Sequence, residues 1–268
     1  MGEMIVSFDG TNLYLNKETV PGARAAAVIV HGLCEHQGRY DYMAELFHKE
    51  GISTYRFDHR GHGRSEGERT FYTTFRELLD DTNVVVDMAI AENPEIPVFL
   101  IGHSMGGFTV SLYGAKYPDK KLRGIITSGA LTHDHKGTIS SLPGGMDVHM
   151  RLPNQLGSAV CSVAEVVEWY GKDPYNTDSY TPGLCYALKD GLAWFKDHVS
   201  EFAYPVLMLH GEEDGLVGVQ DTYDFFKEVT VKDKQMKIYG NLFHEIFNEY
   251  CRDEVIGDVI SWIQNRIG

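Results

Sequence analysis

The chain contains no run of 18 apolar residues, which is about the length that a helix needs to cross a bilayer. It also has no basic N-terminal region followed by an apolar stretch, the pattern of a secretory signal peptide. Position 6 is Val6, whereas a myristoylation motif carries Ser or Thr there. We therefore expect neither a signal peptide nor a lipid anchor.

Cysteine and positive charge are also scarce. The four cysteines are scattered without a C-x-x-C pair, at Cys34, Cys161, Cys185 and Cys251, which predicts reduced thiols and a cytoplasmic protein. Lys and Arg number 24 against 38 Asp and Glu, so the formal net charge is −14. This charge argues against binding to nucleic acid and against stable docking on anionic bilayers, and it leaves at most transient contact with a membrane surface.

Apolar strands alternate with helical segments over most of the 268 residues. Continuous apolar runs such as 25–30 and 98–101 are typical of strands that are buried on both faces. The alternation predicts an α/β protein with a mostly parallel twisted sheet and helices on both faces, preceded by a hairpin around Asp9-Gly10. The pattern breaks at 131–203, so we divide the chain into a core, 1–130 and 204–268, and an inserted helical cap, 131–203.

A strand-turn-helix segment surrounds Ser104. The motif Gly102-His103-Ser104-Met105-Gly106 follows an apolar strand and opens a helical run to Lys116. This is the nucleophile-elbow pattern G-x-S-x-G, in which a sharp turn exposes the serine oxygen and the glycines remove clashes. Ser104 is therefore the predicted nucleophile. A serine here also argues against dehalogenase or epoxide chemistry, which uses an aspartate nucleophile.

An acid and a base follow in the order that this arrangement requires. Asp214 lies in the loop after a buried strand that ends near Gly211, and we predict that it orients the base. Glu212 and Glu213 are the competing candidates for this role. His244 follows the next strand, just before a C-terminal helix that we predict over 249–266, and is the predicted general base among 12 histidines.

The predicted oxyanion hole uses two backbone N–H groups. His31-Gly32 follows the apolar strand 25–30, and we expect the N–H of Leu33 to act with the N–H of Met105. A metal site at His31 and His36 is the alternative reading, but no carboxylate or cysteine cluster at ligand spacing completes it, so we predict no metal. The glycine-rich loop 58–65 lacks the P-loop lysine, which favours a structural turn over a phosphate site.

Four segments together resemble the monoacylglycerol lipase and lysophospholipase branch of the α/β-hydrolases: residues 31–40, 57–67, 102–107 and 244–249. The resemblance covers most of the chain except the middle, where family members carry a cap that determines substrate. It implies the α/β-hydrolase fold and the roles of nucleophile for Ser104, orienting acid for Asp214 and base for His244. It also implies an oxyanion hole at Leu33 and Met105.

These observations predict a serine hydrolase that needs no cofactor and cleaves esters with an apolar acyl chain, foremost a monoacylglycerol or a lysophospholipid. The apolar stripe Val160–Tyr170 predicts a cap helix with one buried face that packs on the cap or lines an acyl tunnel. A short-acyl or aromatic-acid esterase of the cinnamoyl or feruloyl type is the alternative enzyme. A non-catalytic ligand-binding receptor on the same fold is the alternative of another class.

Overall fold

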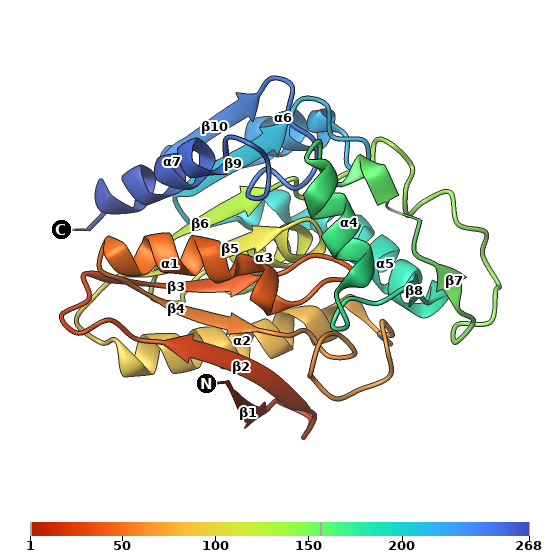
Figure 1. The fold of residues 1–268 in the computed structure, drawn as a ribbon, viewed down its shortest axis with the longest axis horizontal. Coiled ribbons are helices and arrows are strands. Elements are labelled where there is room, and N and C mark those ends of the chain that lie inside the picture. The colour runs from red at the N-terminus through yellow and green to blue at the C-terminus, as the bar shows by residue number, and fades with distance from the viewer. Residues whose placement is uncertain (1, 156, 268) are drawn as a thin grey trace.

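A central sheet of eight strands organises the computed structural model, which describes residues 2–155 and 157–267 (Figure 1). The strand order is β1-β2-β4-β3-β5-β6-β9-β10; β1 and β2 are antiparallel to their neighbours, and the other strands are parallel. The strands are β1 (Glu3–Val6), β2 (Asn12–Glu18), β3 (Ala25–Val30), β4 (Ile52–Phe57), β5 (Val98–His103), β6 (Leu122–Ser128), β9 (Val206–Gly211) and β10 (Lys234–Tyr239). The predicted mostly parallel sheet is confirmed.

Helices cover both faces of this sheet. The core helices are α1 (Asp41–Lys49), α2 (Phe75–Glu92), α3 (Met105–Lys116), α6 (Val219–Glu228) and α7 (Arg252–Gln264). Strand β3 shows why: Ala26, Val28 and Val30 belong to the apolar cluster that includes α2 and α3, whereas the alternate residues of β3 belong to the cluster that includes α1 and α7. Successive strand residues point to opposite faces, so a continuous apolar run needs cover on both.

The C-terminal helix begins later in the structure than the sequence predicts. We expected it from Glu249, but α7 begins at Arg252. The Glu249 carboxylate instead accepts hydrogen bonds from the backbone N–H groups of Phe243, at 3.1 Å, and Ser162, at 2.9 Å. Glu249 therefore joins two loops and lies outside the helix.

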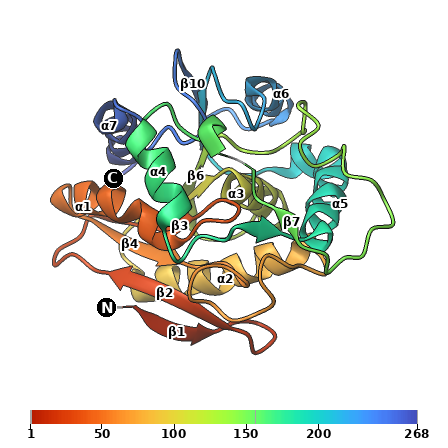
Figure 2. The same ribbon diagram turned by 45° about the vertical axis from the view of Figure 1, so that its right-hand side comes forward.

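The insertion lies at the carboxyl ends of the parallel strands, as both views show (Figures 1 and 2). It contains β7 (Leu152–Pro153), α4 (Ala164–Lys172), β8 (Ser179–Tyr180) and α5 (Pro182–His198), besides the short helix η2 (Gly157–Ala159). Helix α5 packs against α2 and α3, whereas α4 contacts η2 of the same segment. We keep the name cap for residues 131–203.

The apolar face that the stripe predicts for α4 is only half-buried, at Val166, Val167 and Tyr170. None of the residues of this helix is buried, and Trp169 is 63 % exposed. Val160 and Cys161, which precede the helix, are the buried part of the stripe. Helix α5, with buried residues such as Leu184 and Leu188, supplies the apolar face that seals the cap onto the core.

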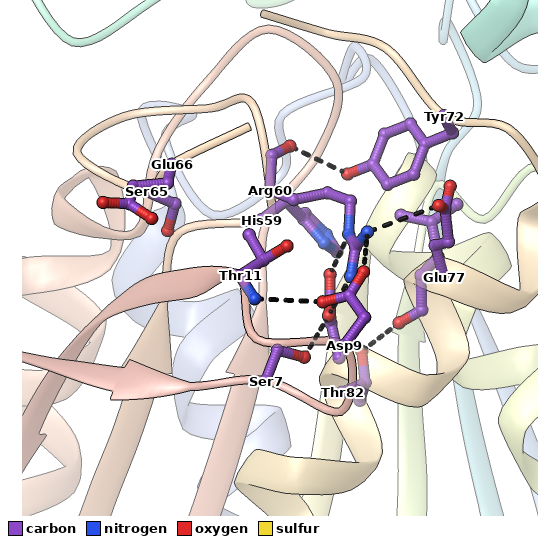
Figure 3. A network of polar contacts seen from close by, with 12 residues as sticks. Ser7, Asp9, Thr11, His59, Arg60, Ser65, Glu66, Tyr72, Glu77 and Thr82 are labelled. Atoms are coloured by element: carbon purple, nitrogen blue, oxygen red, sulfur yellow. Dashed lines mark hydrogen bonds and ion pairs between the residues drawn. The ribbon is translucent and has the colours of Figure 1, made fainter. Parts of the chain in front are cut away.

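A buried ionic network anchors the glycine-rich loop 58–65 (Figure 3). The guanidinium of Arg60 donates two hydrogen bonds of 2.7 Å to the carboxylate of Asp81 in α2 and one of 2.8 Å to Asp9 in the β1–β2 turn. Ser7 also donates to Asp81. These ion pairs tie the loop to α2 and to the β1–β2 turn.

Within residues 2–155 and 157–267, we find no helix that combines the length and the apolarity required to cross a membrane.

Candidate active site

Ser104 lies between β5 and α3 with a strained backbone. Its φ is 55° and its ψ is −115°, a conformation that non-glycine residues adopt at a cost of about 1–3 kcal/mol. The strain is held by a hydrogen bond of 2.9 Å from Ser104 N to Ser128 O in β6 and one of 2.8 Å from Phe108 N to Ser104 O. The elbow geometry expected from the motif is present.

Close packing explains the glycines of this turn. A Cβ atom on Gly106 would lie 2.0 Å from the carbonyl oxygen of Val30, and one on Gly102 would lie 2.2 Å from the carbonyl oxygen of Gly106. Both distances are far below van der Waals contact with backbone atoms that have no room to move. The absence of side chains therefore lets α3 begin directly against β3 and brings Ser104 next to the loop after that strand.

Asp214 and His244 meet across two loops. Asp214 follows β9, His244 follows β10, and Oδ2 of Asp214 lies 2.6 Å from Nδ1 of His244. The other carboxylate oxygen, Oδ1, accepts from the N–H groups of Leu216, at 2.8 Å, and Val217, at 2.9 Å. These bonds fix the carboxylate, and with Nδ1 engaged, Nε2 of His244 is free to exchange a proton with a substrate or a serine.

Burial and charge shape the pKa values of this pair. Asp214 is 2 % exposed; burial alone raises the pKa of its carboxyl, but the charge of His244 and hydrogen bonds from His210 and His244 hold that pKa well below its ordinary value. Burial lowers the pKa of His244, but the charge of Asp214 and its hydrogen bond outweigh this and raise the pKa above its ordinary value. Asp214 is therefore ionised, and it increases the basicity of His244.

Ser104 and His244 line the same apolar chamber, which has a volume of about 50 Å³. Among the residues that the structure describes, no hydrogen bond joins the two side chains; such bonds often tighten only when substrate is bound. The remaining walls are apolar apart from one threonine: Leu33, Met105, Leu131, Thr138, Ile139, Leu188, Leu216 and Val217. The chamber lies between core loops, the start of the cap and helix α5.

The two predicted oxyanion donors border this chamber. Leu33 follows β3, and Met105 is the first residue of α3, where backbone N–H groups have no partner within the helix. In the described part of the chain, neither N–H donates to a protein acceptor. The positive end of the α3 dipole also favours negative charge at this point.

The structure shows the surroundings of the alternative candidates, Glu212 and Glu213 for the acid and His31 and His36 for a metal site. Glu212 and Glu213 are exposed, whereas Asp214 is buried against His244. His36 lies 2.9 Å from Asp173 of the cap, and His31 accepts from the backbone N–H of His59. No group of three or more potential metal ligands occurs among the described residues.

Sequence reasoning gave no role to several residues that contact the acid and the base. Nε2 of His210, at the end of β9, lies 3.0 Å from Asp214, and the ring of His103 lies 4.6 Å from the ring of His244. Gly129 follows β6 with φ 52°, and a Cβ there would lie 3.0 Å from Nδ1 of His244. Their positions in the sequence could have indicated them, because each lies at or just after the carboxyl end of a parallel strand, where binding sites form in such sheets.

Comparisons with known proteins agree with this geometry. The family model for serine aminopeptidase, S33, matches residues 21–250. A monoacylglycerol lipase of Mycolicibacterium smegmatis is 33 % identical over 91 % of this chain and 89 % of its own length. A monoglyceride lipase of Rattus norvegicus is 28 % identical over 98 % of this chain and 90 % of its own length. The crystal structure of the Paleococcus ferrophilus monoacylglycerol lipase is 29 % identical and superposes with a TM-score of 0.82, covering 95 % of this chain and 99 % of that one. The resemblance and the fold expected from the sequence are confirmed.

Proposed function

The chain belongs to the serine aminopeptidase S33 family of α/β-hydrolases, and we propose that it hydrolyses esters with an apolar acyl chain, foremost monoacylglycerols and lysophospholipids. It is an ester hydrolase. The substrate class is supported by the similarity to monoacylglycerol lipases along nearly the whole chain. It is also supported by the apolar walls of the chamber at Ser104.

In the proposed mechanism, Ser104 attacks the acyl carbonyl while Nε2 of His244 takes the hydroxyl proton. The N–H groups of Leu33 and Met105 stabilise the oxyanion, and each such donor contributes about 3 kcal/mol to transition-state stabilisation. His244 then gives its proton to the leaving alcohol, which is glycerol from a monoacylglycerol or a glycerophosphodiester from a lysophospholipid. Water repeats the sequence on the acyl-enzyme and releases the fatty acid.

Asp214 has an electrostatic and orienting role in this mechanism. Its hydrogen bond to Nδ1 of His244, at 2.6 Å, selects the tautomer whose Nε2 accepts a proton. The carboxylate also stabilises the imidazolium that forms while the proton resides on His244. The observation that carries the proposal is the Asp214–His244 pair, whose imidazole lines an apolar chamber that the strained Ser104 also lines.

The size of the chamber specifies the first test. A volume of about 50 Å³ holds about four water-sized groups, so about four carbon atoms beyond an acetyl group find apolar contact. Each buried methylene contributes about 0.8 kcal/mol, which gives about a hundredfold in kcat/KM if the contact persists in the transition state. We expect kcat/KM on monomeric glyceryl esters to rise about a hundredfold from acetyl to hexanoyl and to rise further to octanoyl.

The acyl series is measured below micelle formation, together with labelling of Ser104 by a fluorophosphonate probe. The small chamber favours one competing function, a short-acyl esterase. If acetyl or butyryl esters are the best substrates, or cinnamoyl esters surpass all alkyl esters, the lipid assignment fails while the catalytic roles stand. An unlabelled Ser104 in the folded protein would instead support a non-catalytic receptor.

A further inference from the structure

A buried arginine joins the two loops that carry the proposed oxyanion hole and base. Arg39 donates to Glu35 of the loop after β3, at 2.8 Å, and to both carboxylate oxygens of Glu245, at 2.6 Å each. The three side chains are 6 %, 4 % and 5 % exposed, respectively. Bidentate pairs of this kind fix the relative orientation of both partners, because the guanidinium and the carboxylate are planar.

The Glu35 end of this network holds the peptide that precedes the oxyanion donor, and His31 holds the next one. Oε1 of Glu35 accepts from the backbone N–H of Gly32 at 2.5 Å and from the hydroxyl of Tyr40 at 2.8 Å. Nε2 of His31 accepts from the N–H of His59, so Nδ1 carries the proton and donates to the carbonyl oxygen of Gly32 at 2.7 Å. That carbonyl shares a rigid peptide plane with the N–H of Leu33, which points the opposite way.

The Glu245 end fixes the backbone beside the proposed base. Glu245 directly follows His244, and its own N–H donates to the carbonyl oxygen of Val160 at 2.7 Å. Its carboxylate also accepts from Nδ2 of Asn248 at 3.0 Å. Arg39 therefore links the loop that carries the Leu33 donor to the loop that carries His244.

The same arginine balances the charge around the imidazole. Four titratable groups face or adjoin His244: Asp214 through its hydrogen bond, Glu245, Glu35, and His103, whose burial lowers its pKa to about 3. Lys136 donates to the backbone oxygen of Asp214. Glu245 and Glu35 each act to raise the pKa of His244, and the charge of Arg39 opposes both carboxylates.

We propose that Arg39 is a positioning residue for the ester hydrolysis proposed above: it aligns the oxyanion loop with the base loop and neutralises Glu35 and Glu245 beside His244. The inference rests on the proposed function. It attributes no contact with the reacting atoms to Arg39. Its two effects, alignment and charge balance, are separable by substitution.

The test compares Arg39→Met with Arg60→Met as a matched control. Both arginines are buried, with side chains 6 % and 9 % exposed, and both hold carboxylates in bidentate geometry, but Arg60 binds Asp81 and Asp9 away from His244. For Arg39→Met we expect kcat on hexanoylglycerol to fall about thirtyfold with KM within threefold, because a misdirected donor loses part of the value of an oxyanion contact. The acid limb of the pH profile, which is the rise of kcat/KM with pH, should shift to a pH about one unit higher. The reason is that two carboxylates lose their counter-charge. Arg60→Met should lower the unfolding temperature and leave the limb in place.

Two further variants separate the effects and guard against a folding failure. In Arg39→Met/Glu245→Gln the limb should return toward its wild-type pH while kcat stays low. Arg39→Lys keeps the positive charge but loses the bidentate hydrogen bonds of the guanidinium. It should therefore lower kcat and leave the pH of the acid limb unchanged. The inference is overturned if folded Arg39→Met and Arg39→Lys keep kcat within twofold, or if KM alone changes, which would make Arg39 a substrate contact. A wild-type enzyme without ester turnover would contradict the proposed function itself, whatever the arginine variants do.

Discussion

The loops that carry the proposed catalytic residues differ sharply from helix α4 of the cap in their contact with water. Asp214 and His244 are 2 % and 4 % exposed, and hydrogen bonds to other protein groups hold both. Helix α4 has no buried residue, and Trp169 on it is 63 % exposed. Helix α5, in the same cap, packs firmly on the core through residues such as Leu184 and Leu188.

This difference separates chemistry from selectivity within one chain. The buried loops are held in one geometry, so changes there should reduce turnover for every acyl length. Under the proposed function, cap residues that border the chamber contact the acyl chain, so changes there should alter the dependence on acyl length. The following predictions test this division, beginning with the largest expected effect.

Replacement of the proposed nucleophile or base should have the largest effect. Ser104→Ala or His244→Ala alone should lower kcat by about 10⁶ on every ester, since members of a triad act as a unit. The measurement is kcat on acetyl, butyryl and hexanoyl glyceryl esters, and His149→Ala serves as the control, because that side chain is 56 % exposed and lies beside Glu68. If folded His244→Ala keeps a tenth of the activity, another imidazole such as His103 is the base.

Removal of the charge of Asp214 should lower kcat less than removal of the nucleophile or the base. Asp214→Asn keeps the size of the side chain but removes the charge that stabilises the imidazolium, so kcat should fall by about 10⁴ on every acyl length. Glu213→Gln is the matched control one residue away, and its exposed side chain predicts activity within twofold of wild type. Equal losses in the two variants would show that Asp214 has no special role.

Much of the fold was predictable because its signals are local. The strand Ala25–Val30 has the bounds of the apolar run in the sequence, since it is an uninterrupted pattern with clear ends. The elbow at Ser104 was predictable for the same reason. Asp214 and His244 were assigned from their positions after parallel strands, and the structure brings these two side chains together.

The contacts between distant segments were not predictable in this way. Arg39 binds Glu245, which is 206 residues away in the sequence, and no local spacing signals that pairing. The apolar stripe before and within α4 predicted a buried face, but the pattern gives only the amphipathicity of a helix and not the surface that covers it. In this structure Leu188 of α5 and the loop at Ile139 border the chamber at Ser104, whereas Tyr170 of α4 lines a smaller cavity beside it.

The pH dependence tests the charge of the core site. The proposed base must be neutral to accept the serine proton, so kcat/KM should increase tenfold per pH unit below the pKa of His244 and level above it. The sequence alone placed this rise at about pH 6 to 7, from the reference pKa of about 6.5. Because Asp214 raises the pKa of His244, the midpoint should lie above pH 6.5 and be the same for butyryl and hexanoyl esters.

A pH series on both esters measures this midpoint. In Asp214→Asn the residual activity should have its midpoint at lower pH, because the charge that favours imidazolium is gone. A profile flat from about pH 5 to 9 while chemistry limits the rate would exclude a histidine base.

The smallest effect concerns two leucines on one helix of the cap. Leu184 and Leu188 lie four residues apart on α5, and both are at most 1 % exposed, but only Leu188 borders the chamber beside Ser104 among the described residues. Leu188→Ala should lengthen the chamber and raise the ratio of kcat/KM for octanoyl over hexanoyl esters about tenfold, because two more methylenes gain contact at about 0.8 kcal/mol each. Leu184→Ala should leave this ratio unchanged, although either truncation should cost about 2–5 kcal/mol of unfolding free energy. Denaturant unfolding of both variants checks that the stability losses match. Equal acyl profiles in the two variants would mean that α5 supports the core without determining chain length, and the proposed division between chemistry and selectivity would then have to be drawn elsewhere in the cap.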